Sequence, residues 1–81
     1  MLSEYIQKTM EAAHYEIIED EKSYWGELPG FQGVWGKAET LEKCRYELKE
    51  ALEDWIIYRL RNKLALPVVD GIDLNVVEQA A

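Results

Sequence analysis

The chain has 81 residues, 48% of them apolar, which is enough for one small folded domain and too few for two. Its sixteen acids and nine bases give a net charge of −7, so the surface as a whole repels nucleic-acid phosphates and favours a basic protein as partner. A single cysteine excludes an internal disulfide framework. With a polar start and no apolar run near the roughly 20 residues that cross a bilayer, the sequence predicts a cytoplasmic domain with no membrane segment.

The first half of the chain predicts a short helix followed by a three-stranded meander. Apolar residues at three- and four-residue steps mark residues 1–12 as a helix, with Ser3 as its N-cap. Residues 13–39 alternate between apolar and polar side chains and carry turn residues, which predicts strands in HYEIIED, SYWGEL and GVWGKAE. The glycines in this part suit corners, and one of them suits a close approach of the next helix to the sheet.

Residues 40–64 predict one long amphipathic helix, with Thr40 as its N-cap. The expected buried stripe consists of Leu41, Cys44, Leu48, Ala51, Leu52, Trp55, Ile56 and Leu60. Residues 65–81 form a tail with a turn at Asp70-Gly71, and a fourth strand there stays open. The chain is therefore predicted to be a single α+β domain, in which the long helix packs on one face of an antiparallel meander.

The alternation of the strands predicts which large side chains share a face. If the small and aliphatic residues lie under the helix, Trp25 and Trp35 share the opposite face, which is then more apolar than ordinary exposed sheet. On the helix, Tyr46 and Ile57 lie eleven residues apart, nearly in line and away from the main stripe. We expect these four residues to form protein contacts and the chain to self-associate through its tryptophan face.

The glycine-rich run from Gly30 to Ala38 does not have the residues of a nucleotide-binding loop. A phosphate-binding P-loop would need glycine where Phe31 stands and Ser or Thr in place of Ala38. The segment 30–33 matches the GxxG of a nucleic-acid-clamping loop in its glycines, but its central residues are neither basic nor small. The run is more simply a junction between strands and helix.

Residues that carry chemistry in enzymes are few. His14 is the one histidine, so neither a catalytic triad nor a histidine metal cluster can form within one chain. Cys44 lies on the buried stripe and is expected to be an inert packed thiol. The acids Glu16, Glu19, Asp20 and Glu21 cluster at a predicted turn, where solvated charge is a simpler interpretation than a cation site. We therefore expect no cofactor and no metal.

A series of short motifs resembles the HicB-type antitoxin family over residues 13–68. The motifs are a meander ending in Glu27-Leu28-Pro29-Gly30, a glycine corner, Thr40 as a helix cap, Glu42, Glu47, Ala51 and Leu52 along the helix, and a closing Leu66-Pro67. The resemblance implies a partial RNase H-like fold without catalysis. It also implies a small basic HicA-type toxin, which cleaves mRNA, as the partner, and frequent oligomerisation.

The chain departs from the family pattern in three places. Residues 31–39 lengthen the glycine corner, the helix in residues 1–12 is an addition, and the residues after Val68 are too few for the C-terminal DNA-binding domain of many members. Toxin binding is thus the expected function, and operator binding is not implied.

In that function, the acids of the sheet and hairpin, Glu16, Glu19, Asp20 and Glu27, would speed the encounter with a basic toxin. Two alternatives stay open. One is a solitary oligomeric relative with another protein partner. The other is a degenerate RNase H-like nuclease that holds metal through Glu16, Glu19 or Asp20.

Overall fold

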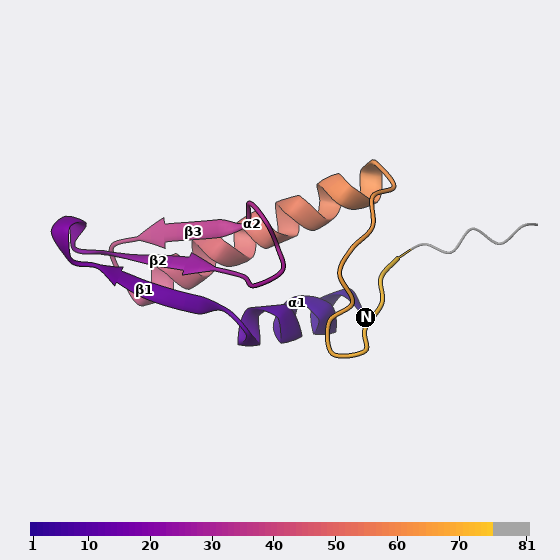
Figure 1. Ribbon diagram of the computed structural model, residues 1–81, viewed down its shortest axis with the longest axis horizontal. Helices are drawn as coiled ribbons and strands as arrows, with labels where there is room; N and C mark the ends of the chain where they lie inside the picture. The colour runs from indigo at the N-terminus through magenta and orange to yellow at the C-terminus, as the bar shows by residue number, and fades with distance from the viewer. Residues whose placement is uncertain (76–81) are drawn as a thin grey trace, which may run out of the picture.

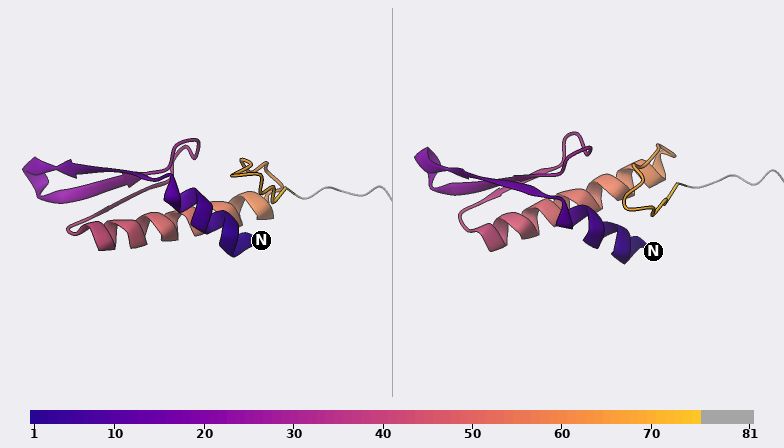
Figure 2. Two further views of the ribbon diagram at one scale, coloured as in Figure 1. Left: turned by 90° about the horizontal axis from the view of Figure 1, so that it is seen from below. Right: turned by 60° about the horizontal axis from the view of Figure 1, so that its bottom comes forward.

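The computed structural model describes residues 1–75, which form two helices and a three-stranded sheet in two layers (Figure 1). The elements are α1 (Leu2–Glu11), β1 (His14–Ile18), the single-turn 3-10 helix η1 (Glu19–Glu21), β2 (Ser23–Glu27), β3 (Trp35–Ala38) and α2 (Leu41–Arg61). The sheet is antiparallel in the order β1-β2-β3, and α2 runs along one of its faces (Figure 2). The predicted α+β fold is confirmed.

The long helix begins where the sequence predicts it and ends three residues earlier. The Thr40 hydroxyl accepts a hydrogen bond from the Lys43 amide at 3.1 Å, so Thr40 is the N-cap. At the other end Asn62 is the C-cap, and Lys63 leaves the helix with a positive φ of 54°. The buried side chains of α2 are Cys44, Leu48, Leu52 and Ile56, whereas the predicted core residues Leu41 and Leu60 are exposed because they lie in the first and last turns of the helix.

Two glycines let α2 lie directly on the sheet. A Cβ atom at Gly36 of β3 would stand 2.6 Å from the backbone nitrogen of Leu48 and 3.0 Å from the carbonyl oxygen of Cys44. At Gly26 of β2 it would stand 2.9 Å from the ring of Tyr15 and 3.3 Å from Cys44 Sγ. The expected close approach of helix and sheet is therefore confirmed, and Gly36 is the point where the two backbones meet.

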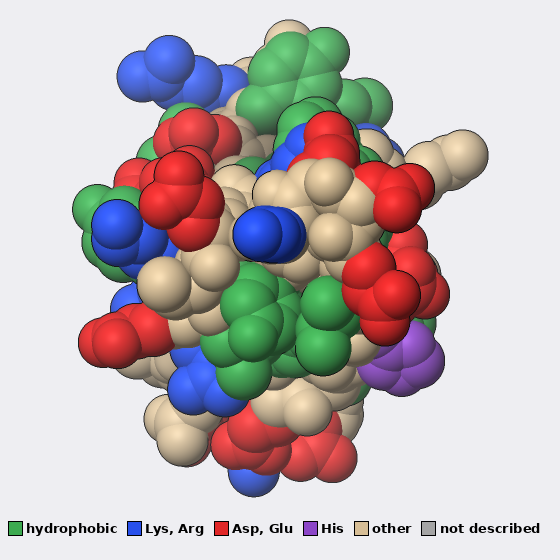
Figure 3. Space-filling model, turned by 90° about the vertical axis from the view of Figure 1, so that its left-hand side faces the viewer, with side chains coloured by type: hydrophobic (Ala, Val, Ile, Leu, Met, Phe, Trp, Pro, Cys, Tyr) green, Lys and Arg blue, Asp and Glu red, His purple; other side chains and the backbone are tan. Residues whose placement is uncertain are grey.

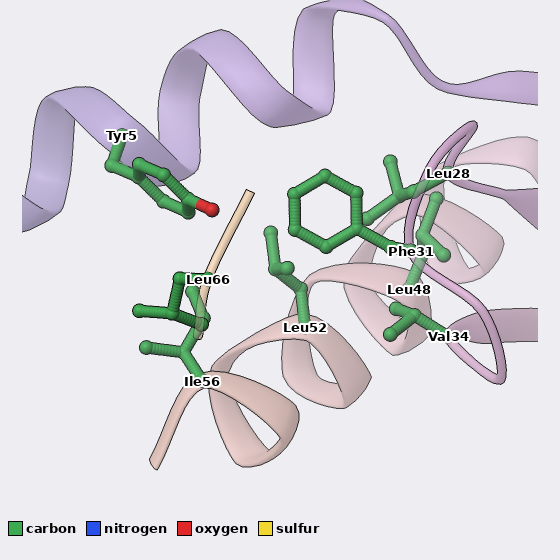
Figure 4. Packing of buried hydrophobic residues seen from close by; sticks show 8 residues of the cluster. All are labelled: Tyr5, Leu28, Phe31, Val34, Leu48, Leu52, Ile56 and Leu66. Carbon is green, nitrogen blue, oxygen red and sulfur yellow. The ribbon is translucent and has the colours of Figure 1, made fainter. Parts of the chain in front are cut away.

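The hydrophobic core extends beyond the sheet to α1 and to the segment after α2 (Figure 4). Phe31, in the loop between β2 and β3, is buried and packs edge-on against Tyr5 of α1 and at a tilt against Trp55 of α2. The Tyr5 hydroxyl donates a hydrogen bond of 2.6 Å to the carbonyl of Pro67. These contacts attach α1 and the C-terminal segment to α2.

One expectation about the chain ends was wrong, and one possibility was left open. α1 begins at Leu2, and the Tyr5 amide bonds to the carbonyl of Met1, so Ser3 lies inside the first turn and is not the N-cap. In residues 65–75 the structure has no fourth strand but a single bridge between Val69 and Ile72, which closes the predicted turn at Asp70-Gly71. Residues 76–81, the rest of the predicted tail, lie outside the described part of the chain.

Candidate protein-binding face

The face of the sheet that α2 does not cover carries two cross-strand rows of side chains, which we call the open face. In the register of the sheet, one row is His14, Glu27 and Trp35, and the other is Glu16, Trp25 and Lys37. Successive side chains of a strand point to opposite faces, and the alternate positions Gly26 and Gly36 touch α2. The prediction that both tryptophans share the face away from the helix is therefore confirmed.

The two tryptophans of the open face stack on each other. Trp25 and Trp35 have ring centroids 4.6 Å apart and nearly parallel planes, at 8°. Trp35 nevertheless remains 50% exposed. Mutual stacking fixes both rings across the β2–β3 pair and presents a rigid aromatic surface to solvent.

The charges around this stack are mostly acidic and partly unpaired. Glu16 lies opposite Trp25 and Glu27 opposite Trp35 in the register, and neither carboxylate forms a salt bridge with any residue of the described part of the chain. Lys37, the cation of this face, pairs with Glu21 of η1 at 2.7 Å. The stack is thus flanked by two carboxylates free to pair with a cation from outside.

The hairpin end continues this acidic character. Glu19 and Asp20 are exposed in η1. Ile17 of β1 is also exposed and pairs with Tyr24 of β2 near the same end of the sheet. Seen from this end, hydrophobic side chains gather in the middle of the surface with acidic ones beside them (Figure 3). The predicted interface acids therefore belong to two neighbouring places, Glu16 and Glu27 on the sheet and Glu19 and Asp20 at its tip.

A hollow of about 570 Å³ opens beside the stack. It is lined by Trp25, Trp35 and the loop 28–34, and its one charged lining residue is Glu27. Gly30 and Gly33 turn this loop with φ values of +84° and +86°, which other residues adopt only with strain. The hollow was not predicted from the sequence, in which only the two glycines after a tryptophan-bearing strand mark the turn of the loop.

The other predicted contact residues lie elsewhere. Tyr46 and Ile57 are 62% and 52% exposed on α2, in the layer beneath the sheet, so they do not join the open face. The negative charge of Glu50 and its hydrogen bond raise the pKa of the Tyr46 phenol. The structure therefore divides the predicted interface into a sheet surface and a separate helix surface.

The groups considered for catalysis or metal binding are not assembled into a site. His14 is exposed on β1, while Cys44 is buried and its thiol donates to the carbonyl of Gly36 at 3.5 Å. Burial raises the pKa of this thiol, which keeps it protonated and unreactive. Within residues 1–75, no three histidine, cysteine or acidic side chains come together in a way that would hold a metal ion.

Comparison with known families gives a match to the family described as UPF0150-like over residues 4–67. The chain belongs to the UPF0150-like family. A solved structure with the same fold as this UPF0150-like chain is the crystal structure of TTHA0281 from Thermus thermophilus, which is 34% identical. The alignment covers 95% of both chains with a TM-score of 0.87. No curated protein matches the sequence. Neither helix in residues 1–75 has the length and apolar character that crossing a membrane requires.

Proposed function

We propose that this UPF0150-like chain is a non-catalytic interaction protein, a HicB-like antitoxin that acts in the cytoplasm and neutralises a small basic HicA-type toxin. The observation that carries the proposal is the open face, where a half-exposed tryptophan stack is flanked by Glu16 and Glu27. An aromatic centre with unpaired acids around it is complementary to a basic protein surface.

The charge of the whole chain supports the same class of partner. A net charge of −7 attracts a basic protein over distances of about a Debye length, roughly 8–10 Å at ordinary ionic strength, and the exposed acids of η1 extend the attraction to the tip of the hairpin. Tryptophan then contributes the buried contact after the encounter, since desolvated aromatic side chains dominate interface energetics. Acids would set the association rate and the stack the dissociation rate.

A role without chemistry fits the positions of the polar groups better than the nuclease alternative does. Metal-assisted hydrolysis needs carboxylates that converge from several elements. Glu16 points from β1 to the open face, whereas Glu19 and Asp20 lie in η1 at the hairpin tip. In this proposal the three acids attract the partner.

Self-association is a separate part of the proposal. The sequence predicted it through the tryptophan face, but the acidic side chains on the open face favour a different surface. Two copies that met through their open faces would bring Glu16 and Glu27 against the same residues of the other copy, which costs free energy. The exposed Tyr46 and Ile57 of α2 remain accessible when the open face holds the toxin. We therefore place the contact between copies on α2.

The direct test is an RNA cleavage assay with the purified chain and the small basic HicA-type protein that the proposal expects a neighbouring gene to encode. We expect an excess of wild-type chain to stop cleavage and Trp35→Ala to require a higher concentration for the same effect. Glu4→Gln, which removes one exposed charge on α1, is the matched control. A toxin that stays fully active with excess chain would exclude the antitoxin role and favour a solitary oligomeric domain with another partner.

A further inference from the structure

We propose that the hollow beside the Trp25–Trp35 stack binds one arginine side chain of the basic partner. This inference rests on the proposed function, because it assumes a basic protein on the open face, and it adds the chemistry of the residue that anchors it. Three observations support it. They are the residues that line the hollow, the lack of a salt-bridge partner for Glu27 among residues 1–75, and a contact between Arg59 and Trp55 within the same chain.

The hollow has the composition of a site for a flat cation. Its lining is aromatic, aliphatic or glycine apart from Gln32 and Glu27, and Glu27 is the only residue there with a charge. The electron-rich faces of indole rings attract cations, and one carboxylate at the edge of such a surface adds a directed salt bridge. A neutral ligand would leave Glu27 uncompensated, and an anion would be repelled by it.

The carboxylate of Glu27 is available for this purpose. It lies between His14 and Trp35 in its row of the sheet, is exposed, and has no salt-bridge partner among residues 1–75. The nearby cation Lys37 is held by Glu21 at 2.7 Å. An incoming guanidinium therefore does not compete with a cation of the described chain for Glu27.

The third tryptophan shows the same kind of contact already made. The guanidinium of Arg59 lies 4.8 Å from the ring centroid of Trp55, and its Nε donates a 2.7 Å hydrogen bond to the carbonyl of Ala65. The loop 28–34 lies between the Arg59–Trp55 contact and the hollow. Its residues Gly30 and Gln32 line the hollow on one side and the surface around Trp55 and Arg59 on the other. Trp55 is thus covered by an arginine of the chain, whereas the stack on the other side of the loop has no such cover from the described residues.

Arginine fits this site better than lysine or a second copy of the chain. A guanidinium is planar, can stack on indole while donating two parallel hydrogen bonds to one carboxylate, and is more weakly hydrated than an ammonium. A second copy would bring its own acids along with any arginine, so its approach to the open face is electrostatically opposed.

The test is a titration of the nitrogen-15-labelled chain with blocked tetra-arginine, with tetralysine as the comparison, while the three tryptophan indole N–H signals are followed by NMR. We expect the Trp25 and Trp35 signals to shift saturably and the Trp55 signal to stay, because Arg59 already covers that ring. Tetralysine should bind the wild type about 3- to 10-fold more weakly than tetra-arginine does. Tetra-arginine should bind Trp35→Ala and Glu27→Gln about 3- to 10-fold more weakly than it binds the wild type. This is the range that one cation–π or charged contact supplies. Glu4→Gln removes one negative charge, as Glu27→Gln does, and should leave the affinity unchanged.

Each other outcome overturns the inference. Binding would be explained by net charge alone if all three tryptophan signals shifted equally or if the two peptides bound with equal affinity. The same conclusion would follow if Glu27→Gln and Glu4→Gln lost equal affinity for tetra-arginine. The toxin assay separates this inference from the proposed function. If the toxin is neutralised equally well by wild type and Trp35→Ala, the arginine site is wrong and the antitoxin role stands. If tetra-arginine binds as described but the toxin stays active, the site stands and the antitoxin role is wrong.

Discussion

Substituting Gly36 by alanine tests the packing that holds the two layers together. The added Cβ would lie 2.6 Å from the Leu48 nitrogen, 2.9 Å from Leu48 Cα and 3.0 Å from the Cys44 carbonyl oxygen. Ordinary contacts of this kind begin near 3.4 Å, so α2 would have to move away from β3 by about 0.8 Å. All three contacted atoms belong to helix backbone, which no side-chain rotation can displace.

The expected cost is about 3 kcal/mol of unfolding free energy or more, the upper end of what overpacking a well-packed interior causes. A chain of this length has a total stability of about 4–12 kcal/mol, so the variant would lose a large fraction of it. Gly36 does not have a positive φ, so the loss would report the steric contact and not backbone strain.

Urea unfolding followed by far-UV circular dichroism measures this difference. Gly26→Ala is the matched control, because its Cβ would meet the Tyr15 ring at 2.9 Å and Cys44 Sγ at 3.3 Å, and side chains can shift. We expect it to cost about 1 kcal/mol, within the usual range for overpacking. A loss below about 1 kcal/mol for Gly36→Ala, or a larger loss for Gly26→Ala, would refute the account of the helix–sheet contact.

Three further outcomes follow from the same structure. Leu52→Ala should lower the unfolding free energy by about 2–5 kcal/mol because the side chain is fully buried, while Glu50→Ala should change it by less than about 0.5 kcal/mol; equal effects in urea unfolding would mean that the buried face of α2 is misplaced. Burial raises the pKa of both the Cys44 thiol and the Tyr5 phenol, so the unfolded chain loses these protons at a lower pH than the folded chain does. The unfolding free energy should therefore fall as the pH rises above 9.0, the ordinary pKa of a thiol. A Cys44→Ala, Tyr5→Phe variant whose unfolding free energy falls as steeply with pH as that of the wild type would contradict this. Ile57→Glu should give a smaller species than wild type in sedimentation, and a wild type that is monomeric at high concentration would remove self-association from the proposal.

The sequence predicted the layers and the faces because these depend on local patterns. Strand alternation placed Trp25 and Trp35 together, and the hydroxyl of Thr40 together with the spacing of the apolar residues that follow it located the long helix. The same patterns fail at the ends of elements. Leu60 continues the apolar spacing of α2, but it is exposed in the last turn of the helix, where the repeat alone cannot show that packing ends.

The hollow depended on contacts between distant parts of the chain and was not predictable from the pattern. It forms because Phe31 turns inward to pack between Tyr5 of α1 and Trp55 of α2, which leaves the outer side of the loop beside the stack. The absence of a fourth strand from residues 65–75 has a similar cause. The side chain of Asn75 accepts from the amide of Leu66 and donates to its carbonyl, so a side chain takes the hydrogen bonds that a strand partner would have made.

The central claim is that the chain neutralises a basic toxin by binding and not by chemistry, and an inhibition titration tests it most directly. The proposed HicA-type toxin would be held at a concentration well above the dissociation constant, and residual RNA cleavage would be measured against added chain. The account predicts that cleavage falls in proportion to the complex formed, ends at a fixed stoichiometric ratio, and returns when high salt separates the pair. Complete inhibition by a small fraction of an equivalent, or toxin that stays inactive after separation, would mean that the chain acts catalytically.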